Sequence, residues 1–232
     1  MKNLIHIDLV PNFEDDDYEI IKNLNQKISK INIKEIKEEV LKILKFYFPH
    51  GEIFFFNSAR GALSFLLKQL NEFKKNEIIT QAFSCLVVPN AIKFTNYKPI
   101  YVDIDETYNL DIKDLKRKIN ENTKVIIIQN TFGIPAKIDE ILKIAKQNNI
   151  LIIENLTHSL GAKYNNKYLG NFGDFVLLSF NRNKVISSII GGALIVNNKN
   201  FLEKIKKSYE SLPELSQKEI QKIIFTGKVL YQ

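Results

Sequence analysis

The chain has few of the residues on which disulfide-bonded and metal-binding proteins depend. Its 232 residues include a single cysteine, Cys85. This excludes an internal disulfide framework and a Cys-x-x-Cys zinc or redox site. The three histidines, His6, His50 and His158, lie far apart in the sequence and form no HExxH-type pair.

Long apolar runs are absent as well. No stretch of 18 uncharged apolar residues occurs, so the sequence predicts no membrane-spanning helix. The first apolar run is short and ends at Asp8, which does not fit a signal peptide. We therefore expect a cytoplasmic protein with no membrane partner.

Arginine is also scarce, although the net charge is +7. The chain has 35 isoleucines, 30 lysines and 25 asparagines, all encoded by A/T-rich codons, and only three arginines. The lysines are scattered, and no run of five basic residues exists. We attribute the excess lysine to nucleotide bias and expect no nucleic-acid partner.

What the chain does have is a regular alternation of short apolar runs and amphipathic segments. The runs are typical of strands buried on both faces, and the segments have helical spacing. This pattern predicts an α/β fold, a three-layer αβα domain with a mostly parallel central sheet. The strands are predicted at Ile53–Phe56, Glu77–Thr80, Pro99–Ile104, Lys124–Gln129, Ile150–Glu154, Phe175–Phe180 and Ala193–Val196. The helices are predicted at Ile33–Phe48, Ala62–Phe73, Val87–Thr95, Asp111–Ile119, Ile138–Gln147, Phe201–Ser211 and Ser216–Phe225.

The residue pattern along the sequence changes twice, which predicts three segments. Residues 1–50 form a helical N-terminal segment, residues 51–200 the α/β domain, and residues 201–232 a lysine-rich helical segment. No repeat of fixed period is visible.

A small-residue turn, Ser58-Ala59-Arg60-Gly61, opens a predicted helix directly after a strand. Free backbone N–H groups and the helix dipole at such a point suit a phosphate. The alternative is an ordinary strand–helix turn in which Asn57 or Ser58 is the N-cap.

Three further polar segments follow predicted strands, where open α/β sheets place their ligands. Glu154 to His158 form one, although a lone histidine is more often structural, and Asn130 to Pro135 form a second that a tight turn also explains. The third runs from Ser179 to Lys184 and precedes the pair Gly191-Gly192. A partly buried lysine there would have a lowered pKa and could form an imine with an aldehyde.

In this order and spacing, the four segments resemble one family, the pyridoxal-phosphate (PLP) sugar aminotransferases of the DegT/DnrJ/EryC1/StrS group. The resemblance runs from about Phe54 to Asn198 and includes NSARGAL, NTFGIP, IIENLTHSLGA and LLSFNRNKVISSIIGGALIV. It implies the large-domain fold of PLP transferases of the aspartate-aminotransferase type. It also implies transamination of a nucleotide-linked keto sugar in polysaccharide biosynthesis, with glutamate as the amino donor.

The resemblance also implies a role for each site residue. Backbone amides of Arg60 and Gly61 would hold the PLP phosphate, and the Ser179 hydroxyl would add a hydrogen bond to it. Cys85 lies in the segment that packs near the cofactor ring. His158 stands where the family has a residue stacked on that ring. Lys184 matches the lysine that forms the internal aldimine and later carries the proton.

Two departures from the family pattern bear on activity. Asn155 stands where the family has an aspartate that keeps the pyridine nitrogen protonated, and the neighbouring Glu154 should point to the opposite face of the sheet. Only about 30 residues follow Asn200, whereas the family continues into a smaller domain. The interpretations of this shortness are a truncated product, half of a split enzyme and a degenerate paralogue.

These departures leave several functions open. The chain could be an aminotransferase that works as a homodimer or with a partner chain supplying the missing domain. It could be a catalytically weak or inactive PLP-binding protein. A sugar dehydratase fits less well, because the dehydratase branch has a histidine in place of the imine lysine. A generic α/β binding module without PLP is the remaining alternative.

Overall fold

The computed structural model describes residues 32–70, 75–181, 184–188 and 190–216, with the single positions 19, 23, 218 and 219. Seven strands form one sheet in the order β1-β9-β8-β5-β4-β2-β3. From β8 to β3 all neighbours are parallel, whereas β9 runs antiparallel to both β1 and β8. The strands are β1 (Glu52–Phe56), β2 (Glu77–Gln81), β3 (Lys98–Val102), β4 (Thr123–Ile128), β5 (Leu151–Asn155), β8 (Phe175–Ser179) and β9 (Gly192–Val196).

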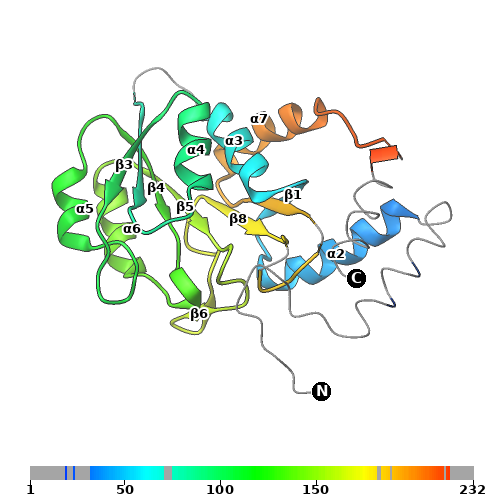
Figure 1. Cartoon of the computed structure of the whole chain (residues 1–232), viewed down its shortest axis with the longest axis horizontal. Helices are drawn as coiled ribbons and strands as arrows, with labels where there is room; N and C mark the ends of the chain where they lie inside the picture. Colours follow the sequence, from blue (N-terminus) through cyan, green and yellow to red (C-terminus); the bar gives the residue numbers. More distant parts are fainter. Residues whose placement is uncertain are drawn as a thin grey trace.

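Helices cover both faces of this sheet (Figure 1). Alternate residues of a strand point to opposite faces, so Ile127 and Ile153 pack with one set of helices while Ile126 and Ile152 pack with the other. The first set is α3 (Ala59–Gln69), α4 (Val87–Phe94) and α7 (Lys199–Glu210). The second set is α5 (Ile112–Lys118) and α6 (Ile138–Gln147), and α2 (Ile33–Tyr47) packs against β8 and β9 on the same face. The predicted three-layer αβα fold with a mostly parallel sheet is confirmed.

Most predicted elements lie within a few residues of the observed ones, and α6 has the predicted bounds. Helix α3 begins three residues earlier than the apolar spacing predicts, because the Ser58 side chain caps it. A small hairpin of β6 (Lys163–Tyr164) and β7 (Lys167–Tyr168) was not predicted. The helix predicted at Ser216–Phe225 lies largely outside the described residues. The division into three segments remains a prediction.

Candidate functional site

The carboxyl ends of the parallel strands bring the predicted site residues to one edge of the sheet. Asn155 is the last residue of β5 and Ser179 the last residue of β8. These two strands are neighbours, with Asn155 opposite Leu177. Loops that follow β2, β4 and β5 carry Cys85, the Asn130–Gly133 turn and His158 to the same edge. Such an edge is where open parallel sheets bind their ligands.

The start of α3 is held against this edge by a close backbone contact. Ser58 forms an isolated bridge with Gly191, and Ser179 pairs with Gly192. A Cβ atom on Gly192 would lie 2.4 Å from the Ala59 backbone nitrogen. Only glycine therefore lets β9 approach the first turn of α3, and this approach puts Ser179 beside the helix N-terminus.

The same turn also shows the features of an ordinary helix cap. The Ser58 hydroxyl accepts a hydrogen bond from the Gly61 amide at 3.1 Å, so this amide already has a partner. The first amides of α3, including that of Arg60, have no partner within the helix. Arg60 itself is exposed. A phosphate at this point would use the first amides and would share or replace the Ser58 contact.

Lys184 and His158 meet at the centre of the edge. Lys184 Nζ lies 3.3 Å from His158 Nε2, and both side chains are half-buried. Burial lowers the pKa of Lys184, and an electrostatic interaction with Cys85 acts in the opposite direction. Burial also lowers the pKa of His158, and the positive charge of Lys184 adds to this. The pair therefore carries less positive charge near neutral pH than an exposed lysine and histidine would.

Asn155 and Glu154 have separate environments. Asn155 is buried, and its Oδ1 accepts a hydrogen bond from the Thr157 amide at 3.3 Å. Glu154 is fully buried and accepts three backbone hydrogen bonds, from Gly170, Phe172 and Gly173. Burial raises the pKa of Glu154, and these three donors oppose that shift. Glu154 is thus engaged in holding the 170–173 loop, and Asn155 is the side chain at the strand end.

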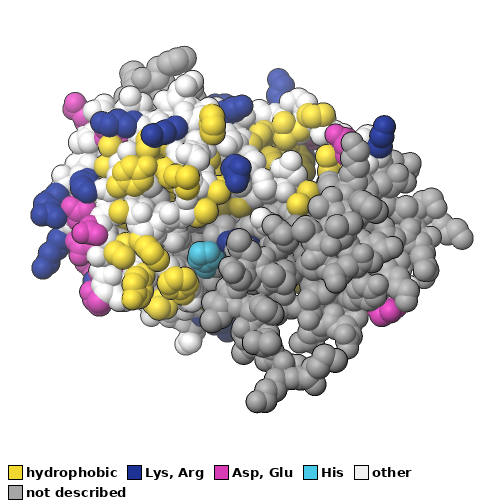
Figure 2. Space-filling model, viewed as in Figure 1, with side chains coloured by type: hydrophobic (Ala, Val, Ile, Leu, Met, Phe, Trp, Pro, Cys, Tyr) yellow, Lys and Arg dark blue, Asp and Glu magenta, His cyan; other side chains and the backbone are white. Residues whose placement is uncertain are grey.

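Three aromatic residues to which the sequence assigned no individual role cluster together, and one of them, Phe132 of the Asn130–Pro135 segment, contacts His158. Phe83, Tyr108 and Phe132 are exposed and form ring pairs with centroid separations of 5.8–6.3 Å. The Phe132 ring also stacks on the His158 ring at an interplanar angle of 6°. In the view of Figure 2, hydrophobic side chains gather on the face that also displays a histidine. We call Phe83, Tyr108 and Phe132 the aromatic rim.

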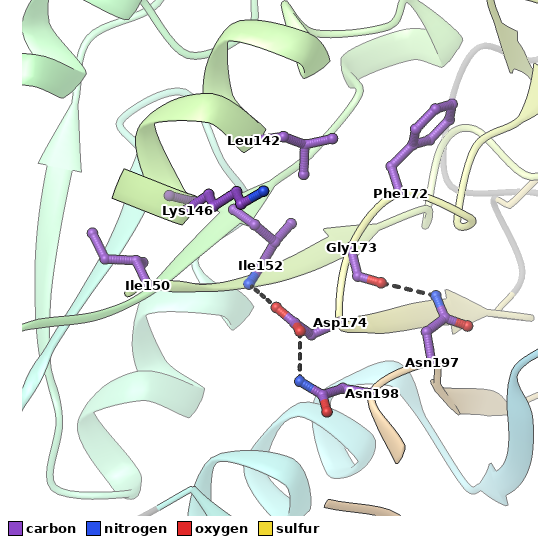
Figure 3. Close-up of a pocket in the computed structure, with 10 residues that line it drawn as sticks. Leu142, Lys146, Ile150, Ile152, Phe172, Gly173, Asp174, Asn197 and Asn198 are labelled. Atoms are coloured by element: carbon purple, nitrogen blue, oxygen red, sulfur yellow. Dashed lines mark hydrogen bonds between the residues drawn. The ribbon is translucent and has the colours of Figure 1, made fainter. Parts of the chain in front are cut away.

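A groove of about 410 Å³ lies at the opposite edge of the sheet, at the amino end of β5 (Figure 3). Three of its polar side chains, those of Asp174, Asn197 and Asn198, are hydrogen-bonded within the lining. Asp174 accepts hydrogen bonds from the Ile152 amide and from Asn198, and Asn197 donates to the Gly173 carbonyl. These three groups are already paired, and the one lysine of the groove, Lys146, is exposed rather than half-buried as Lys184 is.

Two kinds of site find no support in the described part of the chain. None of its helices is long and apolar enough to cross a lipid bilayer. The described His, Cys, Asp and Glu side chains form no group of three or more that could hold a metal ion.

Known proteins resemble the chain in sequence. The GDP-perosamine synthase of Escherichia coli O157:H7 is 35% identical over 144 residues, which make up 62% of this chain and 40% of that protein. A Helicobacter pylori protein, UDP-4-amino-4,6-dideoxy-N-acetyl-beta-L-altrosamine transaminase, is 33% identical over 153 residues, or 65% of this chain and 41% of that protein. The chain thus spans well under two thirds of the length of these relatives.

Solved structures resemble it in fold. The Helicobacter pylori aminotransferase PseC superposes with a TM-score of 0.76 at 24% identity, covering 95% of this chain and 64% of PseC. The E. coli GDP-4-keto-6-deoxy-D-mannose-3-dehydratase, solved with bound hydrated PLP, has a TM-score of 0.75 at 26% identity, covering 92% of this chain and 58% of that one. PLP, the cofactor expected from the sequence, is thus the cofactor of this group of proteins. The sequence pattern of the DegT/DnrJ/EryC1/StrS aminotransferase family matches residues 32–222, so the chain belongs to this family.

Proposed function

We propose that this chain binds PLP through Lys184 and takes part in amino-group transfer to a keto sugar attached to a nucleotide. The observation that carries the proposal is the pairing of a half-buried lysine with His158 at the carboxyl edge of the sheet. The relatives named above are a perosamine synthase and a sugar transaminase. Their names support a nucleotide sugar as the substrate class.

The residues at this edge fit the chemical groups of PLP. Lys184 Nζ is an amine for its aldehyde, and the first amides of α3 with Arg60, Gly61 and Ser179 are donors for its phosphate. Asn155 offers an amide to the ring nitrogen, while His158 and Cys85 lie near Lys184. The close approach of Gly192 to Ala59 keeps the donors from α3 and β8 together.

The electrostatics of Lys184 support its role as the nucleophile. Only a neutral amine attacks an aldehyde, and burial raises the neutral fraction of Lys184 above that of an exposed lysine. His158, whose pKa is also lowered, stays neutral near neutral pH and can accept a hydrogen bond at Nε2 from the Lys184 ammonium. The neutral Lys184 amine can take up a proton at Nζ, and the ammonium so formed can release it within the same site.

Asn155 limits the chemistry that the site supports. When bound, PLP supplies an electron sink, and this sink is strongest with a protonated ring nitrogen. An amide can donate a hydrogen bond to that nitrogen but stabilises its proton less well than a carboxylate. Glu154 does not substitute, because its oxygens accept backbone hydrogen bonds from the 170–173 loop. We therefore expect slow proton removal from the substrate.

The remaining elements of the proposal concern partners and location. Glutamate is the proposed amino donor. A second copy of the chain, or a partner chain that supplies a further domain, is proposed to complete the site. The exposed aromatic rim, which contacts His158 through Phe132, supports this, since a solvent-facing apolar cluster at a ligand site is typical of a surface that becomes covered. A cytoplasmic location is proposed, and the single free cysteine is compatible with it.

A trapping experiment tests the proposal. The full chain is incubated with PLP and reduced with borohydride, and the pyridoxyl group is located by peptide mass spectrometry. We expect it on Lys184 and expect no label at this position in Lys184→Ala. L-glutamate is then added to unreduced, PLP-loaded protein, and 2-oxoglutarate is measured. Release of one equivalent per bound cofactor supports amino transfer, and labelling elsewhere than Lys184 contradicts the proposal.

A second candidate function is PLP binding without amino transfer. Asn155 is the observation that favours it, because a neutral partner weakens the electron sink. Asn155→Asp separates the two functions. If the aspartate variant releases 2-oxoglutarate much faster than the wild type, the site is a weakened transferase. If both proteins carry the label on Lys184 and neither releases 2-oxoglutarate, the chain is a binding protein.

A further inference from the structure

The turn that carries Phe132 has an unusual backbone. Asn130, Phe132 and Gly133 all have positive φ angles, of 51°, 55° and 83°. Glycine and asparagine adopt this region readily, but a bulky aromatic residue does so rarely. A turn of this shape needs support from its surroundings, and such strain is often found at functional sites.

Buried hydrogen bonds from three parts of the fold supply that support. The Thr131 amide donates to Asn109 Oδ1 at 2.8 Å, and the Ala136 amide donates to Asn130 Oδ1 at 2.9 Å. Gln81, at the end of β2, donates from Nε2 to Thr131 Oγ1 at 3.0 Å. The turn is therefore fixed to the sheet, and the position of Phe132 follows from it.

Phe132 in turn contacts His158. The two rings are stacked with centroids 6.1 Å apart, although the Phe132 side chain is 63% exposed. A functional histidine is usually oriented by a hydrogen bond on its second nitrogen. Among the described residues, the buried His158 Nδ1 has no such partner. Two contacts that the ring makes in the described part of the chain are the stacking on Phe132 and the approach of Lys184 Nζ to Nε2.

We propose that Phe132 is a positioning residue that holds the His158 imidazole against the Lys184 amine. The effect of Phe132 on the capture of PLP rests on the proposed function, whereas the contact between Phe132 and His158 does not. Within the described residues, the titratable groups that act on the pair are His158 and Lys184 themselves and Cys85. Loss of the Phe132 ring should admit water to His158 and loosen its contact with the amine.

The test is an NMR titration of the histidines in the cofactor-free protein. The chain has only three histidines, so His158→Gln assigns the signal. In the wild type the pKa of His158 should lie below its ordinary value, because the side chain is half-buried beside Lys184. In Phe132→Ala it should rise towards the ordinary value. The rate at which PLP captures Lys184 at neutral pH should fall several-fold in the same variant.

Three further variants separate the effect of the Phe132 ring on the His158 titration from the effect of the backbone conformation. Phe132→Tyr keeps the ring and should behave like the wild type. Phe132→Asn suits the positive φ angle but removes the ring, so it should behave like Phe132→Ala if stacking is what matters. Phe94→Ala removes an aromatic side chain that is 81% exposed at the end of α4, and should leave the His158 titration unchanged.

Amide NMR spectra establish that each variant is folded. An unchanged His158 titration in both folded Phe132→Ala and folded Phe132→Asn would overturn the proposal. If the titration responds as expected but PLP never labels Lys184, the positioning contact stands and the proposed function fails.

Discussion

Replacing Gly192 by alanine tests how the start of α3 and the end of β8 are held together. The added Cβ would lie 2.4 Å from the Ala59 nitrogen, 2.5 Å from the Ser58 carbonyl carbon and 2.9 Å from the Leu178 oxygen. All three are backbone atoms, so no side chain can rotate away. To reach ordinary contact at 3.4 Å, the strand and the helix N-terminus must separate by about 1 Å.

The size of the effect follows from this displacement. Overpacking of a buried site costs about 1–3 kcal/mol, which corresponds to a fall in Tm of roughly 2–12 °C for a chain of this length. A hydrogen bond of about 2.9 Å stretched by about 1 Å is lost. A lost bond to a charged phosphate is worth about 1.5–3 kcal/mol, so PLP should bind about 10- to 100-fold more weakly.

Thermal unfolding and PLP titration measure the two effects separately. Gly161→Ala is the matched control, because its φ of +85° makes alanine strained while the nearest atom, Tyr47 Cε1, is 4.0 Å away. It should lose about 1–2 kcal/mol of stability with PLP affinity unchanged. If Gly192→Ala retains wild-type PLP affinity, the start of α3 does not take part in binding the phosphate.

Three further predictions concern single titratable groups. Glu154→Gln should lower the free energy of unfolding by about 1–3 kcal/mol, because the glutamine amide nitrogen would face the Gly170 N–H and leave that donor unpaired. An unchanged midpoint of chemical denaturation would show that the 170–173 loop does not depend on the carboxylate. Hydrogen bonds from the Asp103 amide and Lys118 lower the pKa of Asp114 to about 2. The stability that this carboxylate contributes is therefore present above pH ~4 and is lost as the pH falls towards 2. Asp114→Asn should remove that part of the acid dependence when Tm is measured against pH. Burial lowers the pKa of Lys184, so its acylation, followed by mass spectrometry, should reach half-maximal rate at a lower pH than acylation of a free lysine derivative in the same buffers. Equal midpoints would contradict the assigned environment.

Much of the fold could be predicted because its signals are local. Helix α6 (Ile138–Gln147) has apolar residues at helical spacing, and the apolar run of β4 is buried on both faces. The hairpin of β6 and β7 was missed because each strand has only two residues. The Asn165-Asn166 pair between them, with both φ angles positive, was the available signal.

The candidate site was predictable only in part. The order of polar segments after strands indicated Lys184, His158 and Ser179, because each follows an apolar run that the sequence displays. The role of Phe132 was not visible, since its contact with His158 joins loops after β4 and β5 that meet only when the sheet has formed. The three-donor environment of Glu154 is likewise a long-range feature, because residues 170–173 come from a later loop.

The most direct test of the account is a titration of the full chain with PLP, followed by visible absorbance. Wild-type protein should develop the absorbance band of lysine-bound PLP, and borohydride should remove it. Lys184→Ala should show no band, whereas Lys143→Ala, which removes an exposed lysine of α6, should match the wild type. No band in the wild type, or an equal band in Lys184→Ala, would contradict the claim that Lys184 is the cofactor lysine.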